Sequence, residues 1–109
     1  MAEPGDVVTV DFPGAQGVKR RPALVISTPT YHQYRPDVVL GLITSQTAVA
    51  TGPTDYILQD WTAAHLNRPS AFRAFLVTVP VNRVAVVGHI SQRDWQEIQS
   101  RLRIALAVV

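Results

Sequence analysis

The carboxy-terminal segment, residues 91–109, is the one long stretch of the chain with helical periodicity. Ser91 and Asp94 have the spacing of a capping box, which predicts that a helix begins just after Ser91. Polar and charged residues fill the side opposite the apolar ones, as in an amphipathic helix that packs on a core or on a partner. The apolar stripe consists of Trp95, Ile98, Leu102, Ala105 and Val109.

The residues before this helix form short runs that are typical of strands. β-Branched residues dominate residues 6–12, and an uninterrupted apolar run at 22–27 indicates a strand buried on both faces. Further strands are expected within 38–46, 55–61, 70–79 and 81–90, with loops at 13–17, 28–37 and 47–54 and a brief helix capped by Asp60. The pattern predicts an α+β, mainly β fold: a small curled sheet or barrel of five to seven strands with a C-terminal amphipathic helix.

The composition predicts one globular domain over residues 1–109. Hydrophobic residues make up 47% of the chain, which excludes a disordered protein, and there is no cysteine for a disulfide or a thiolate metal site. Neither end reads as a signal peptide or a bilayer span, so we expect a cytoplasmic protein without membrane contact. The net charge is only +2, although nine of the ten basic residues are arginine. This permits a nucleic-acid partner without requiring one.

Three cations, Lys19, Arg20 and Arg21, stand directly before a proline and the apolar run. The proline favours extended backbone at Arg21, so we expect a rigid strand end to position its guanidinium, with Lys19 and Arg20 on the flexible side. A guanidinium held in this way suits a phosphate. The spacing alone is explained more simply by a salt bridge from Arg21 to Asp11 or Asp37.

Two further groups combine polar side chains with apolar strands. Thr44, Ser45 and Gln46 end a strand, where they suit contacts to a phosphate or a base edge, or the capping of a turn. Arg73 lies inside an apolar run beside Phe72. An arginine next to aromatic residues suits single-stranded nucleic acid, but an edge arginine with its stem on the sheet fits equally well.

The three histidines, His32, His65 and His89, lack metal-ligand spacing, so we interpret them as ordinary surface or half-buried residues. The sequence contains no P-loop, no GxGxxG and no GxSxG motif. We therefore expect neither a metal nor a cofactor.

Several of these segments, in their order along the chain, resemble the MazF/PemK (Kid) family of toxins from type II toxin–antitoxin systems. The segments are GDVVTVDF, a glycine-containing loop, RRPALVIS, LITSQ, PSAFRAFLVT and GHIS, and the resemblance extends over residues 5–106. It implies an SH3-like barrel with a C-terminal helix, usually a homodimer. It also implies a metal-independent endoribonuclease that cuts single-stranded RNA at short recognition sequences, and a cognate MazE/PemI-like antitoxin that blocks the RNA groove. The family's catalytic pair matches Arg21 and Thr44.

The chain departs from this family at its acidic positions. Gln16 lies in the loop where many members have a glutamate, and Phe75 stands where the PemK branch has an aspartate, although Arg73 matches that branch's arginine. No carboxylate near the motifs is therefore left to act as a base. Slow catalysis by positioning and electrostatics alone is then the first expectation, and His32, in the segment YHQY, is the runner-up as a base.

The reaction that the resemblance implies is attack of an RNA 2′-OH on its own 3′-phosphate, which gives a 2′,3′-cyclic phosphate and a 5′-OH end. It needs a base, an acid and positive charge around the phosphorane. We expect Arg21 to supply the charge and Thr44 to hold a non-bridging oxygen. The loops at 13–18 and 47–53 are expected to set the recognition sequence. The expected RNA-binding residues are Gln16, Lys19, Arg20, Ser45, Gln46 and Arg73.

Two other classes of function remain open. CcdB-type inhibitors of gyrase use the same barrel, but they act through a tryptophan-containing tail, whereas this chain ends in IALAVV and has Trp61 and Trp95. A non-catalytic SH3-like module for RNA or protein needs only a basic groove, and the missing carboxylates favour it.

Overall fold

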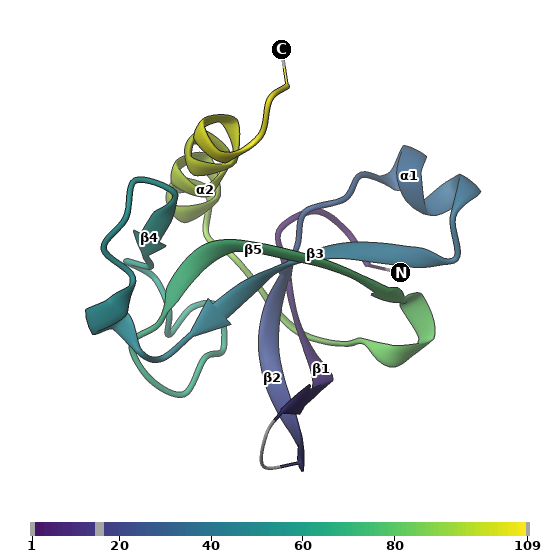
Figure 1. The fold of residues 1–109 in the computed structure, drawn as a ribbon, viewed down its shortest axis with the longest axis horizontal. Coiled ribbons are helices and arrows are strands. Elements are labelled where there is room, and N and C mark those ends of the chain that lie inside the picture. Colours follow the sequence, from purple (N-terminus) through teal and green to yellow (C-terminus); the bar gives the residue numbers. More distant parts are fainter. Residues whose placement is uncertain (1, 15–16, 109) are drawn as a thin grey trace.

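The computed structural model describes residues 2–14 and 17–108, which form one six-stranded antiparallel sheet and two α-helices. The strand order is β4-β5-β3-β2-β1-β6, and the sheet curls into a half-barrel (Figure 1). This confirms the predicted mainly β fold with a C-terminal helix. The elements are β1 (Asp6–Gly14), β2 (Gly17–Val25), α1 (Pro29–Tyr34), β3 (Asp37–Thr44), β4 (Asp55–Ile57), β5 (Ala71–Pro80), β6 (Ala85–His89) and α2 (Gln92–Ala105).

The hairpin of β1 and β2 is longer than the sequence predicts. The two strands stay in register up to the pair Gly14 and Gly17, so Lys19, Arg20 and Arg21 lie inside β2. The expected loop at 13–17 is therefore wrong at positions 13, 14 and 17, which belong to strands, and its residues 15 and 16 lie outside the described residues. The expected flexible position of Lys19 and Arg20 is also wrong. Gly17 has a φ of +102°, a conformation that glycine adopts without steric cost, and β2 begins there.

Two apolar clusters form the core on opposite faces of the sheet. Val7 and Leu24 belong to the cluster under α2, together with Ile98 of that helix. Val8 and Ala23, their neighbours in sequence, belong to the second cluster, which the curl of the sheet encloses with half-buried side chains from β5. Successive strand residues face opposite sides, so the end of β2, residues 23–25, is buried on both faces as its apolar run predicts.

Helix α2 begins at the predicted cap, but the capping box is only half formed. The Ser91 hydroxyl accepts a hydrogen bond from the Asp94 backbone at 3.3 Å. The Asp94 carboxylate is completely buried and accepts from the Tyr56 hydroxyl at 2.6 Å and from the backbone N–H groups of Gln59 and Asp60 at 3.0 and 2.8 Å. Burial and the hydrogen bond to this carboxylate raise the pKa of Tyr56 to about 12. Asp94 thus joins α2 to β4.

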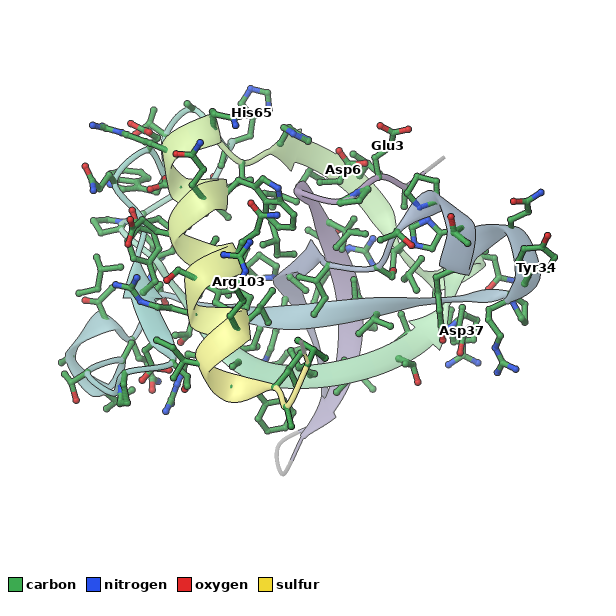
Figure 2. All side chains as sticks on the ribbon, turned by 90° about the horizontal axis from the view of Figure 1, so that it is seen from above. Glu3, Asp6, Tyr34, Asp37, His65 and Arg103 are labelled. Atoms are coloured by element: carbon green, nitrogen blue, oxygen red, sulfur yellow. The ribbon has the colours of Figure 1, made fainter. Side chains whose placement is uncertain are left out.

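The apolar stripe of α2 is covered by the core as far as Leu102. Ile98 is fully buried, and Trp95 and Leu102 are partly buried against the same cluster. Ala105, the last residue of the helix, is exposed, and Val109 lies outside the described residues. Figure 2 shows the helix lying across one face of the sheet.

The predicted loop at 28–37 contains the short helix α1. Thr28 caps this helix, since its hydroxyl accepts from the Tyr31 N–H at 3.3 Å, and Pro29 occupies the first turn. Proline is favoured there because its missing N–H has no partner to lose. The Thr-Pro pair is the signal that the loop prediction overlooked.

The predicted helix after Asp60 is wrong, because residues 61–65 form consecutive turns. The Asp60 carboxylate does not cap this segment. It accepts hydrogen bonds of 2.6 Å from Arg93 and from the Ser91 hydroxyl, and these bonds lower its pKa to about 2. The turns are thereby tied to the start of α2. Within them, His65 has a φ of 64°, which is left-handed backbone.

Candidate functional site

A cavity of about 370 Å³ lies where β2, the end of β3 and the segment 65–70 meet. This volume falls within the range of roughly 300–1,000 Å³ that is usual for ligand sites. We call it the polar pocket. No aspartate or glutamate lies among its lining residues. The polar lining residues from the sheet and the turn after it include Arg20, Arg21, Thr44, Ser45 and Gln46.

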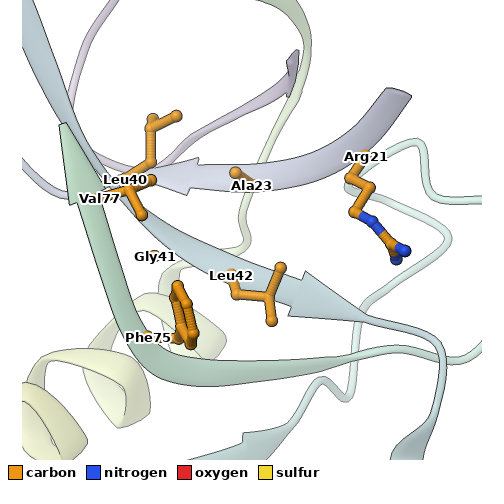
Figure 3. Close-up of a pocket in the computed structure, with 7 residues that line it drawn as sticks. All are labelled: Arg21, Ala23, Leu40, Gly41, Leu42, Phe75 and Val77. Carbon is orange, nitrogen blue, oxygen red and sulfur yellow. The ribbon is translucent and has the colours of Figure 1, made fainter. Parts of the chain in front are cut away.

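Arg21 and Arg20, although adjacent, have different surroundings. The Arg20 guanidinium forms an ion pair with Asp11 at 3.1 Å. Asp37 is bound by Arg35 at 3.5 Å and by the Tyr31 hydroxyl, so neither aspartate takes up Arg21. Among the described residues Arg21 has no ion pair, which overturns the simpler structural explanation of its position. Its guanidinium extends from β2 past Leu42, towards the end of β3 (Figure 3).

Thr44 ends β3, and its hydroxyl is oriented by the turn that follows. Its Oγ1 accepts a hydrogen bond from the Gln46 N–H at 3.1 Å. Because the oxygen accepts this bond, the hydroxyl proton remains available to a ligand oxygen. Ser45 and Gln46 are exposed beside it. Thr44, Ser45 and Gln46 therefore form this turn and also line the polar pocket.

The segment 65–70 completes the pocket with residues that the sequence analysis did not select. It contributes His65, Asn67, Arg68 and Ser70. The His65 Nδ1 lies 2.9 Å from the Val87 carbonyl oxygen of β6. No sequence signal marks this segment, because its place beside β2 depends on turns and on long-range packing.

Other predicted site residues lie elsewhere. Arg73 forms an ion pair with Asp55 at 3.2 Å and does not line the polar pocket, and neither does Lys19. Phe72 is buried in the core, whereas its neighbour Arg73 is half-buried. Gln16 lies outside the described residues.

His32 also lies away from the polar pocket. Its Nε2 is 2.5 Å from the Ser27 hydroxyl, which in turn accepts from the Val39 N–H near the start of β3. Ser27 follows Arg21 by six residues of mostly extended chain, or roughly 20 Å. Figure 2 shows Tyr34, of the same helix as His32, at the far side of the molecule from His65. The structure therefore does not bring the predicted base to Arg21 and Thr44.

A second, apolar pocket adjoins the polar one, and Arg21 lines both. Figure 3 shows Leu42 between Arg21 and Phe75, and Phe75 is 64% exposed. A ligand that bridges the two pockets would meet an anion-binding group next to an apolar surface.

The described residues contain no cluster of three or more histidine, cysteine, aspartate or glutamate side chains that could hold a metal ion. In the same part of the chain, no helix is both long and apolar enough to cross a membrane.

The model of one protein family, described as the PemK-like, MazF-like toxin of type II toxin–antitoxin systems, matches residues 3–106. The chain belongs to this family. No curated protein matches it closely enough in sequence to be counted as a relative.

Solved structures of similar fold include an endoribonuclease and MazF toxins. An endoribonuclease in complex with its cognate antitoxin from a mycobacterial species superposes with a TM-score of 0.82, at 20% identity, over 100% of this chain and 98% of that one. A MazE-MazF complex from Deinococcus radiodurans gives 0.77, at 22% identity over 99% and 98%. The Mycobacterium tuberculosis toxin MazF-mt6 gives 0.73, at 17% identity over 92% and 94%.

Proposed function

We propose that this PemK-like, MazF-like toxin is a metal-independent endoribonuclease that cuts single-stranded RNA, including mRNA, at a short sequence in the cytoplasm. The observation that carries the proposal is the polar pocket, which is lined by Thr44 and by an arginine that has no ion pair among the described residues, and whose described lining includes no carboxylate. A site of this kind favours a phosphodiester over a cationic ligand.

In the proposed reaction, the 2′-OH attacks the adjacent phosphorus and the P–O5′ bond breaks. The products are a 2′,3′-cyclic phosphate and a 5′-OH end. Arg21 stabilises the charge that grows on the non-bridging oxygens, because its guanidinium is not neutralised by a partner. The Thr44 hydroxyl donates a hydrogen bond to one of these oxygens.

The proposed RNA path follows the cations and amides around the pocket. Ser45, Gln46 and Asn67 present donors and acceptors that suit base edges, whereas Arg20 and Arg68 supply positive charge. The segment 65–70 thus joins the loops that we expect to set the recognition sequence. Lys19 and Arg73 lie outside the pocket, so any contact they make is with more distant nucleotides.

Two partners belong to the proposal. A MazE/PemI-like antitoxin would inhibit the toxin by occupying the groove formed by the polar and apolar pockets. Phe75, exposed beside Arg21, suits a peptide that carries both an acidic and an apolar side chain. The toxin itself is proposed to act as a homodimer. The mycobacterial and Deinococcus structures that contain an antitoxin support the first of these proposals.

The test is to incubate the protein with a long RNA and to map new 5′-OH ends. Arg21→Ala should lower the cleavage rate by ~10²–10³, the usual cost of removing a preorganised donor. Arg83→Ala, which removes an exposed arginine outside the pocket, is the matched control and should cleave normally. EDTA should have no effect, and a 2′-deoxy sugar at the cleavage site should abolish the reaction.

Three results would contradict the proposal. They are full activity of Arg21→Ala, cleavage of the 2′-deoxy substrate, and RNA binding without any cut. The last of these would identify a binding module instead. The gyrase-inhibitor alternative would require inhibition of gyrase by a preparation that leaves RNA intact, and the match to the PemK-like, MazF-like family weighs against it.

A further inference from the structure

We propose that His65 is the general base of this site and that its Nε2 takes the proton from the attacking 2′-OH. This inference rests on the proposed ribonuclease function and supplies the proton acceptor that the predicted site lacks. His65 lines the polar pocket together with Arg21 and Thr44. Its side chain is exposed, so a substrate can reach it.

The hydrogen bond at Nδ1 fixes the tautomer of the ring. A carbonyl oxygen can only accept, so the contact of 2.9 Å between Nδ1 and the Val87 oxygen requires a proton on Nδ1. In the neutral ring the lone pair is then on Nε2. Among the described residues Nε2 has no hydrogen-bond partner, whereas the corresponding nitrogen of His32 is bound by Ser27. A base needs such a free lone pair.

The backbone around His65 is held in place by close packing. His65 adopts left-handed φ, and the preceding residue, Ala64, is completely buried in the core under α2. Gly88 of β6 lies against this turn so closely that a Cβ at position 88 would be 2.3 Å from the Ala64 oxygen. A histidine placed on an irregular turn by contacts of this kind is preorganised, which a surface loop alone would not achieve.

The charged and titratable groups near His65 come from β2, from the segment 65–70 and from β6. Strand β2 contributes Arg20 and Arg21, and the segment 65–70 contributes Arg68. On β6 the one titratable residue is His89, whose Nδ1 is bonded to Asp6 at 2.8 Å. The arginines stay protonated and His89 does not line the pocket, so none of these groups competes for the 2′-OH proton at neutral pH.

The proton balance of the step is complete with water as the only co-reactant. Nε2 accepts the 2′-OH proton as O2′ forms its bond to phosphorus. The P–O5′ bond then breaks with its electron pair, and O5′ takes a proton from water. The imidazolium returns its proton to the solvent, so His65 is neutral again for the next turnover.

The variant His65→Asn tests the role of the ring while retaining the backbone, because asparagine tolerates left-handed φ. The substrate is a short RNA that contains the mapped cleavage site, and single-turnover rates are measured between about pH 5 and 9. Wild type should lose activity on the acid side with unit slope, as one base becomes protonated. His65→Asn should be slower by ~10²–10⁴ and should lack this acid limb. His89→Asn, which changes a histidine outside the pocket, should retain both the rate and the limb.

Chemical rescue separates a base from a merely structural residue. Free imidazole should restore part of the activity of His65→Gly, since glycine accepts the same φ and leaves space for the ring. A wild-type rate and pH profile in His65→Asn would overturn the inference. It would also be overturned by a slow variant that retains the acid limb and is not rescued by imidazole. If wild type cuts no RNA, the proposed function itself fails, whereas these two results leave that function intact.

Discussion

Gly88→Ala is the substitution that most directly connects the packing of the turn to the site. The added Cβ would lie 2.3 Å from the Ala64 carbonyl oxygen and 2.9 Å from its carbon. Both atoms belong to the backbone, so no side-chain rotation can relieve the clash. Ordinary contact begins near 3.4 Å. The turn and β6 must therefore separate by about 1 Å, and His65 must move with the turn.

This displacement should affect stability and activity by different amounts. Overpacking of a well-packed contact costs about 1–3 kcal/mol, which corresponds to a decrease in Tm of roughly 4–15 °C for a domain of this size. A misplacement of about 1 Å at a reacting group costs ~10²-fold in rate. The hydrogen bond from His65 to Val87 should also be lost. Thermal unfolding and single-turnover RNA cleavage, measured well below the Tm, give the two values.

Gly41→Ala is the stability-matched control. Its Cβ would lie 2.3 Å from the Phe72 ring, so it should destabilise the core by a similar amount without moving the turn. Gly41 lines the apolar pocket and not the polar one, so we expect the folded Gly41→Ala protein to lose much less of its cleavage rate than Gly88→Ala. The reasoning is refuted if Gly88→Ala retains the wild-type Tm and rate. If both glycine variants lose activity equally, the loss reflects stability and not the position of His65.

Two further substitutions test the contacts that hold α2 on the sheet. Asp94→Ala leaves the buried Tyr56 hydroxyl and two partly buried backbone N–H groups without their acceptor. At about 1–3 kcal/mol for each group, it should lower the unfolding free energy by ~3 kcal/mol, measured by urea denaturation. Tyr56→Phe, which leaves the backbone bonds to the carboxylate intact, should cost less, and equal losses would contradict this account. In the folded protein the pKa of Asp60 is about 2, below its usual 3.8, because of the bonds to Arg93 and Ser91. The charged carboxylate therefore stabilises the fold fully above about pH 4, and this stabilisation is lost as the pH falls towards 2. Asp60→Asn should flatten this part of the acid unfolding curve, and an unchanged curve would show that the carboxylate is not linked to folding.

Much of the fold is predictable from the sequence because the positions of the apolar residues determine which faces of the strands are buried. The run at 22–27 is apolar without alternation, and both faces of β2 are covered at Ala23, Leu24 and Val25. The start of α2 follows from Ser91, whose hydroxyl is a local acceptor. Asp94 shows the limit of such reasoning. Its spacing predicts a local bond to Ser91, but a buried phenol and two backbone donors from β4 and the turn after it bind the carboxylate instead.

The site is predictable to the extent that its residues are local to strand ends. Arg21 and Thr44 stand next to a proline and at the end of an apolar run, and the pairing of β2 with β3 brings these regions together. His65 has no such marker. Its role depends on its left-handed backbone, on the close approach of Gly88 and on the hydrogen bond to the Val87 carbonyl of β6. None of these can be deduced from the residues next to it in the sequence. The position of His32 depends on a tertiary contact in the same way, namely its bond to Ser27.

The structural use of the acidic residues explains why the base of this site would be a histidine. Each of the six aspartates is a hydrogen-bond or ion-pair partner in the fold, and none lines the polar pocket. Their partners are His89 for Asp6, Arg20 for Asp11, Arg35 for Asp37, Arg73 for Asp55, Arg93 for Asp60 and Tyr56 for Asp94. A carboxylate in the pocket would pair with Arg21 and weaken its attraction for phosphate. A neutral imidazole accepts a proton without that penalty, so a pocket with Arg21 and His65 can bind the anion and deprotonate the nucleophile at once.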